Sequence, residues 1–188
     1  MSITINGTGS ISGLSAGGLP DASVTPADLS QPLPLETAKS ATGTSIDFTG
    51  IPSWVKRITV MFDGVSTNGS STVQVQLGTG VGPTFTTSGY LGSSGAMQTA
   101  STLTELNGTG FKVDANHNSA AVLHGAALLA KITGNTWTLL SILGESNGPR
   151  MNHAGGSIAL AAGLTAIRIT TVNGTDTFDA GSVNILYE

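Results

Sequence analysis

The sequence predicts an all-β protein: an antiparallel β-sandwich or jelly roll preceded by an extended N-terminal arm. Only 10 % of the 188 residues are charged, too few for a helical bundle rich in Lys and Glu. Several segments alternate apolar and polar side chains with the period of two that is typical of strands. Asn-Gly pairs, which favour tight hairpin turns, recur along the chain at Asn6, Asn68, Asn107, Asn147 and Asn173.

Residues 1–41 differ in composition from the rest and are predicted to form the arm. Four prolines, at positions 20, 26, 32 and 34, prevent a continuous strand or helix there. Apolar side chains nevertheless recur, which a solvated linker would not need. We therefore expect the arm to lie on a partner surface, with these residues as candidate anchors: Ile3, Ile5, Ile11, Leu14, Leu19 and Leu29.

Residues 42–188 are predicted to form the β domain, with eight or nine strands. The alternation is strict in 72–77 and 166–172. The other candidate strands are 45–48, 55–62, 111–113, 120–132, 136–143, 156–161 and 182–187.

One of these segments has a competing interpretation. Residues 120–131 could form a helix, because Ala and Leu have high helix propensity. Gly134-Asn135 favours a hairpin instead, with 120–132 and 136–143 as its two strands.

The charge balance and the missing cysteines exclude several classes of protein. Seven Lys and Arg residues against eleven Asp and Glu residues give a net charge of −4, which argues against binding to nucleic acid. Without cysteine there are neither disulfides nor thiolate metal sites. A surface with so few charges favours association with other chains. We find no export signal and no apolar segment long enough for a bilayer, so we expect synthesis in a cytoplasm and no membrane insertion.

No motif for catalysis, metal binding or cofactor binding stands out, and we predict that the protein is not an enzyme and has no cofactor. The histidines lack metal-ligand spacing, although one histidine repeated around a trimer axis could still hold an ion. We expect His124 to be packed or at an interface, and His117 and His153 to be solvated in loops. Asp176 and Asp179 share one turn and do not predict the opposed carboxylates of a glycosidase.

Two long loops are the candidate binding surfaces. The first is 78–88, continued by 92–98, and the second is 145–154. The second carries Arg150, Asn152 and His153, a donor-rich set that could hold hydroxyl groups or a sugar acid; it could equally contact a neighbouring subunit. The aromatic residues could stack on sugars, but core packing is the favoured interpretation for Trp54, Tyr90, Trp137 and Tyr187.

Several phrases resemble the C-terminal domain of tailed-bacteriophage and prophage fibre proteins. They are the stretch 46–66 (IDFTGIPSWVKRITVMFDGVS), the later Val75-Gln-Leu-Gly78 and Gly89-Tyr90, and the leader-like 11–24 (ISGLSAGGLPDASV). The resemblance implies a homotrimer of β-sandwich or jelly-roll knobs whose N-termini bind the particle.

The function expected from this resemblance is that of a non-enzymatic virion structural protein. It would be a short trimeric fibre or decoration on the tail or capsid, located in the virion. Its partners would be two further copies of itself, other virion proteins through the arm, and a host cell-surface glycan. The alternative is a carbohydrate-binding or carbohydrate-active domain that acts on host surface polysaccharide.

Overall fold

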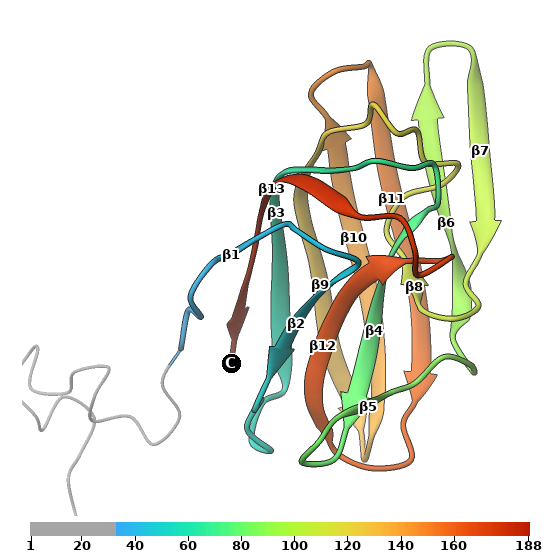
Figure 1. The fold of residues 1–188 in the computed structure, drawn as a ribbon. Helices are drawn as coiled ribbons and strands as arrows, with labels where there is room; N and C mark the ends of the chain where they lie inside the picture. The colour runs from blue at the N-terminus through green and yellow to red at the C-terminus, as the bar shows by residue number, and fades with distance from the viewer. Residues whose placement is uncertain (1–32) are drawn as a thin grey trace, which may run out of the picture. The chain divides into compact units, whose positions relative to one another are not determined.

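The computed structural model describes residues 33–188, and all regular secondary structure in this range is β (Figure 1). These residues form two antiparallel sheets that pack as a sandwich, which confirms the predicted all-β class. No helix in residues 33–188 is long and apolar enough to cross a membrane. The six candidate anchors of the arm, between Ile3 and Leu29, lie outside the described residues.

The larger sheet of the described domain has eight strands in the order β1-β13-β3-β9-β10-β11-β6-β7. Their bounds are β1 Lys39–Ser40, β3 Arg57–Thr67, β6 Leu91–Gln98, β7 Ser101–Leu106, β9 Leu123–Thr133, β10 Thr136–Glu145, β11 Arg150–Ala159 and β13 Phe178–Tyr187.

The smaller sheet has the order β2-β12-β4-β5 and faces the viewer in Figure 1; β8 pairs with β4 beside this path. Its strands are β2 Ser45–Thr49, β4 Val73–Thr79, β5 Thr84–Phe85, β8 Phe111–Lys112 and β12 Leu164–Thr171.

The hydrophobic core lies between the sheets, because alternate residues of each strand point inward. In the large sheet the buried partners Trp137 and Ile158 stand opposite each other on β10 and β11. In the small sheet Leu77 and Ile167 do the same on β4 and β12. Each of these four residues is at most 2 % exposed, so the alternation read from the sequence is the alternation that builds the core.

Each of the nine predicted strand segments contains a strand, with shifted ends. The ambiguous segment 120–132 is strand β9 and forms a hairpin with β10, as Gly134-Asn135 predicted. Gly134 has a φ of 52° in this turn, a conformation that glycine adopts without strain.

The prediction of both binding loops was partly wrong. The segment 92–98 belongs to strand β6, and 101–106 forms strand β7, which the sequence pattern did not predict. The segment 145–154 is a short turn followed by β11, which begins at Arg150. β6 (LGSSGAMQ) shows no apolar alternation, because Gly and Ser occupy half of its positions. Its pairing with β11 and β7 on either side makes it a strand.

Part of the predicted arm runs beside the domain. Leu35 pairs with Leu186, and β1 pairs with β13 through Lys39 and Ser40. Ala41, the last residue of the predicted arm, is 1 % exposed and belongs to the core. Residues 35–41 therefore add a short edge strand to the large sheet.

Candidate functional site

The three candidate receptor-contact residues do not form one donor set. All three lie on β11, where successive side chains point to opposite faces of the sheet. Arg150 and Asn152 face the space between the sheets, and Asn152 is fully buried. His153 is exposed on the outer face, with its ring over Gly95 of β6. The prediction that these three side chains form one donor set is therefore wrong. It treated 145–154 as a loop, whereas residues from Arg150 onward form a strand whose side chains alternate between the two faces.

Arg150 instead belongs to a row of polar side chains at the end of the sandwich. Its backbone partner on β6 is Gln98, and Glu145 of β10 lies on its other side. Arg150 Nε lies 3.2 Å from Glu145 Oε1, and both side chains are about nine-tenths buried. Arg150 Nη2 donates a hydrogen bond to the carbonyl oxygen of Asn116 at 3.1 Å.

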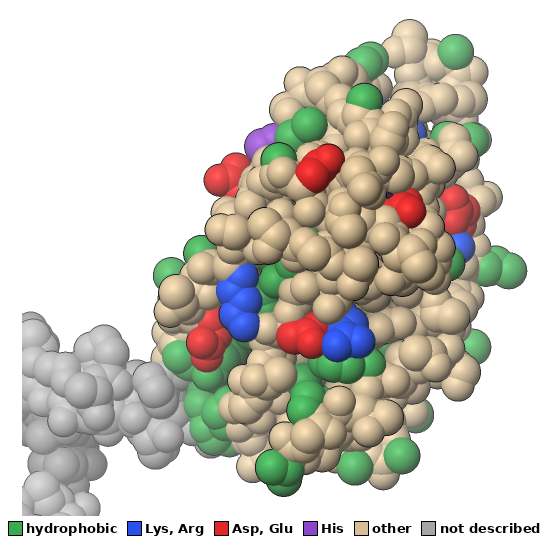
Figure 2. Space-filling view, in the orientation of Figure 1, with side chains coloured by type: hydrophobic (Ala, Val, Ile, Leu, Met, Phe, Trp, Pro, Cys, Tyr) green, Lys and Arg blue, Asp and Glu red, His purple; other side chains and the backbone are tan. Residues whose placement is uncertain are grey.

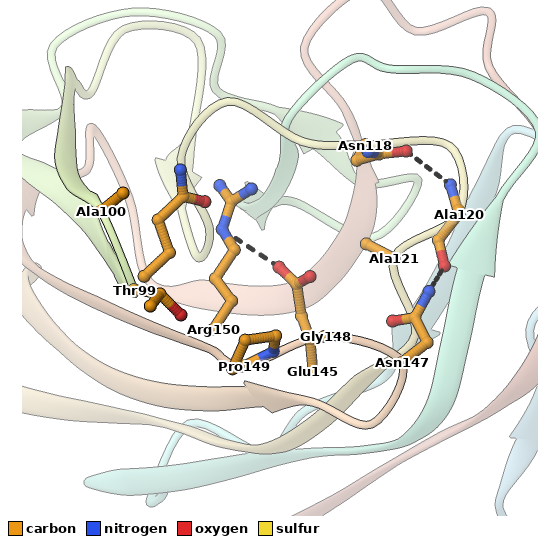
Figure 3. A pocket seen from close by; sticks show the side chains of 11 residues that line it. Thr99, Ala100, Asn118, Ala120, Ala121, Glu145, Asn147, Gly148, Pro149 and Arg150 are labelled. Atoms are coloured by element: carbon orange, nitrogen blue, oxygen red, sulfur yellow. Dashed lines mark hydrogen bonds and ion pairs between the residues drawn. The ribbon is translucent and has the colours of Figure 1, made fainter.

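This row lines a pocket of about 410 Å³, which we call the end pocket (Figure 3). The turn after β6, the segment 118–121 and the β10–β11 turn form its walls. In Figure 3 the Arg150 guanidinium lies beside Glu145 in the pocket, with Asn118 and Asn147 toward the opposite wall. The end pocket can offer hydrogen-bond donors and acceptors, but the Arg150 cation already faces a carboxylate.

The interior behind the end pocket is also polar. Asn152 Nδ2 donates a hydrogen bond to Glu145 Oε1 at 3.1 Å. Asn152 Oδ1 and the hydroxyl groups of Ser94 and Ser141 are buried and have no hydrogen-bond partner within residues 33–188. Buried polar groups of this kind require water or another ligand.

His117 is buried, which corrects the prediction that it is solvated in a loop. Its Nδ1 pairs with Asp114 Oδ2, and its Nε2 lies 3.1 Å from the hydroxyl oxygen of Thr67. This order of carboxylate, imidazole and hydroxyl resembles a nucleophile triad. All three residues are at most 5 % exposed, so a substrate has no access to the hydroxyl group. We assign this cluster a structural role.

The other titratable candidates are structural or isolated. His124 lies on β9 as predicted and is half-buried, with Gly64 N donating to its Nδ1 at 3.2 Å. Asp176 accepts hydrogen bonds from Asn173 Nδ2 at 2.7 Å and Ser71 N at 2.9 Å. The Asn173 bond, followed by the Ser71 bond, holds the pKa of Asp176 below its ordinary value. Within residues 33–188 no group of three His, Asp or Glu residues could hold a metal ion.

The aromatic residues pack in the domain instead of forming an exposed platform, as the favoured interpretation predicted. Trp137, Tyr90 and Tyr187 are 2 %, 4 % and 7 % exposed. Trp54 is half-buried and packs against Tyr187, with 5.8 Å between ring centroids.

Another, smaller pocket of about 240 Å³ lies on the outer face of the small sheet. Gln74 and Gln76 line it, and their amide groups already bond within the domain. Gln74 Nε2 donates to the Thr171 carbonyl at 3.3 Å, and Gln76 Nε2 donates to the Thr109 carbonyl at 2.8 Å. A ligand there would compete with existing bonds, so the end pocket is the better candidate site.

Comparison of the chain with protein-family models, with curated proteins and with solved structures found no match.

Proposed function

We propose that this chain is a virion structural protein of a tailed bacteriophage or prophage, without catalytic activity. In this proposal it forms a short homotrimeric fibre or decoration. Residues 1–41 attach it to the particle through other virion proteins, and the sandwich is a jelly-roll-like knob directed toward the host surface. The observation that carries the proposal is the outer face of β10, β11, β6 and β7 in the large sheet of the described domain, which exposes large apolar side chains and holds no Asp, Glu, Lys or Arg.

This apolar face spans β10, β11, β6 and β7. The register places its side chains on the same side of the sheet: Leu140 stands opposite Gly155, and Met151 stands opposite Met97. Its large apolar members are between 44 % and 78 % exposed; they are Leu91, Met97, Leu106, Leu140, Ile142 and Met151.

The apolar face has no strong charge. In the described domain, the outward positions of β9, β10, β11, β6 and β7 hold no Asp, Glu, Lys or Arg, and the ionisable side chains there are His124 and His153. The outer face of the small sheet differs, since it carries the Arg168–Asp47 ion pair. Figure 2, with this sheet toward the viewer, shows Lys or Arg and Asp or Glu side chains among uncharged ones. The two sides of the sandwich therefore favour different environments.

Two further copies of the chain are the partners that fit this face best. An exposed apolar patch of this kind marks an interaction surface. Without charges, the patch can meet its own copy without electrostatic repulsion, and a closed ring of three copies leaves no patch exposed. Such a ring would also protect β7, an edge strand that is open to unwanted pairing.

Light scattering of the purified chain tests the assembly. We expect a mass near three times 18.8 kDa, and a clean monomer at micromolar concentration would contradict the trimer. The double variant L140D/I142D should dissociate the trimer, because it places charges on the apolar face. V81D is the control: Val81 is an exposed apolar residue too, but it lies in the turn between β4 and β5.

The virion assignment needs a separate test. Antibodies against the chain, labelled with gold, should decorate purified particles on the tail or capsid in electron micrographs. Particles that carry none of the chain would contradict a structural role in the virion, whatever its oligomeric state.

A further inference from the structure

We infer that the end pocket binds a neutral saccharide. The assignment of this saccharide to a host-surface glycan rests on the proposed function. The binding of a saccharide in the pocket does not depend on it. The inference follows from the rigidity of the pocket, its charge balance and its unsatisfied polar groups.

The walls of the end pocket are held in place before any ligand binds. Asn147, in the β10–β11 turn, donates from Nδ2 to the Ala120 carbonyl and accepts at Oδ1 from Val122 N at 3.1 Å. Ser146 N donates to the Val122 carbonyl at 3.1 Å. These bonds join two segments that are about 25 residues apart in the sequence. A preorganised site loses less entropy on binding than a flexible loop does.

The floor of the pocket comes from three neighbouring strands. Glu145, Arg150 and Gln98 form one row across β10, β11 and β6, on the side of the sheet that faces the interior. A volume of about 410 Å³ is within the range of small-molecule sites, about 300–1,000 Å³. Strands position such side chains more rigidly than loops do.

The polar groups of the pocket have unused bonding capacity. Arg150 lines the pocket, but its Nε is buried and has no hydrogen-bond partner within residues 33–188, although Glu145 Oε1 lies 3.2 Å away, so the groups that a ligand can reach are those of Gln98 and Asn118. Gln98 Nε2 donates to Ser101 Oγ at 2.8 Å, which leaves its Oε1 as an acceptor. Asn118 Oδ1 accepts from Ala120 N at 2.9 Å, which leaves its Nδ2 as a donor. A ligand with adjacent hydroxyl groups fits this mixture of donors and acceptors, because each hydroxyl group can both donate and accept a hydrogen bond.

The charge balance selects a neutral ligand. Glu145 compensates the Arg150 cation, so a carboxylate or phosphate would meet a like charge next to Arg150. The described residues that line the pocket include no aromatic or large aliphatic side chain, which disfavours an apolar ligand. Hydroxylated and uncharged compounds remain, and sugars are the class of this kind that cell surfaces present. Binding to one site would be weak and would gain strength from three copies.

The test uses the full chain and four sugars. D-Glucose, D-galactose and N-acetyl-D-glucosamine are the neutral probes, and D-glucuronic acid is the acidic one. We expect at least one neutral sugar to shift the NMR resonances of Arg150 Nε–H and the Gln98 side-chain amide, with a millimolar dissociation constant. Glucuronic acid should bind more weakly than glucose.

The double variant Q98A/T99V removes two polar side chains that line the pocket and should weaken binding by about three- to tenfold. T175V, a threonine replaced in a distant exposed turn, is the matched control and should bind like the original chain. No shift of pocket resonances by any neutral sugar would overturn the inference, and so would tighter binding of glucuronic acid. L140D/I142D separates the two proposals: if it is monomeric and still binds sugar, the pocket stands independently of the oligomeric state.

Discussion

Asp114 and His117, three residues apart after β8, form a hydrogen-bonded pair whose side chains are at most 1 % exposed. Asp114 also accepts a hydrogen bond from Val73 N at 2.9 Å, and His117 extends the chain of contacts to Thr67. The pair therefore ties the segment after β8 to the start of β4 and the end of β3.

Removing the carboxylate of Asp114 should destabilise the domain strongly. In D114A the Val73 N–H and the His117 imidazole both lose a buried partner, and we expect a loss of about 3 kcal/mol in the free energy of unfolding. Urea denaturation measures this. D179A, which removes an exposed carboxylate, is the control and should change stability by less than about 0.5 kcal/mol. Equal urea midpoints for both variants would contradict the structural role of the cluster.

Tyr90 should make the domain sensitive to alkali. Its buried hydroxyl accepts a hydrogen bond from Leu77 N at 2.8 Å. Burial, partly opposed by this hydrogen bond, raises its pKa from 10.0 to about 12. Between these two values the unfolded chain loses the tyrosine proton and the folded chain keeps it, so stability is complete below pH 10 and falls above it.

The variant Y90F tests this assignment. At neutral pH it should lose about 1–3 kcal/mol of stability, because the Leu77 N–H is left without a partner. Above pH 10 its stability should fall less steeply than that of the original chain. Part of the fall should remain, since burial also raises the pKa of Tyr187. Identical alkaline profiles for the two proteins would show that Tyr90 is not the responsible group.

Arg168 joins β12 to β2 in a way that lysine cannot reproduce. Its Nε and Nη2 each donate to one oxygen of Asp47 at 2.7 Å, and its guanidinium lies 4.0 Å from the Phe85 ring centroid. Lysine retains the charge but loses the two-point geometry and the stacking. We expect R168K to lose about 1 kcal/mol of stability. R57K changes the more exposed ion pair with Glu188 and should lose less in the same thermal unfolding measurement.

Two truncations should locate the functional boundary of the arm. Removing residues 1–32 leaves β1 and Ala41 in place, so we expect a folded domain that no longer enters particles. Removing residues 1–41 also deletes β1, and this domain should fold with a lower melting temperature. Circular dichroism measures folding, and particle association measures anchoring. Normal incorporation of the 33–188 domain into particles would show that the anchor lies elsewhere.

The alternation of apolar and polar side chains was sufficient to predict most strands of the sandwich. In 72–77 and 166–172 the alternating apolar residues Val73, Val75, Ile167 and Ile169 all lie in the core, because a strand with one face in the core repeats every two residues. Gly134-Asn135 and Asn173-Gly174 located two turns for a similarly local reason, since Gly134 and Gly174 adopt a positive φ that glycine accepts without strain. These features depend on neighbours in the sequence and can be recognised without the fold.

The pairing of distant segments decided the rest. β6 and β7 contain small and polar residues without a clear period, and their neighbours in the sheet make them strands. The same pairing separates Arg150 from His153 onto opposite faces and brings Glu145 and Gln98 to Arg150. It also buries His117, whose polar surroundings in the sequence predicted exposure. Which polar side chains meet in a pocket depends on long-range register, and no local pattern of residues encodes that register.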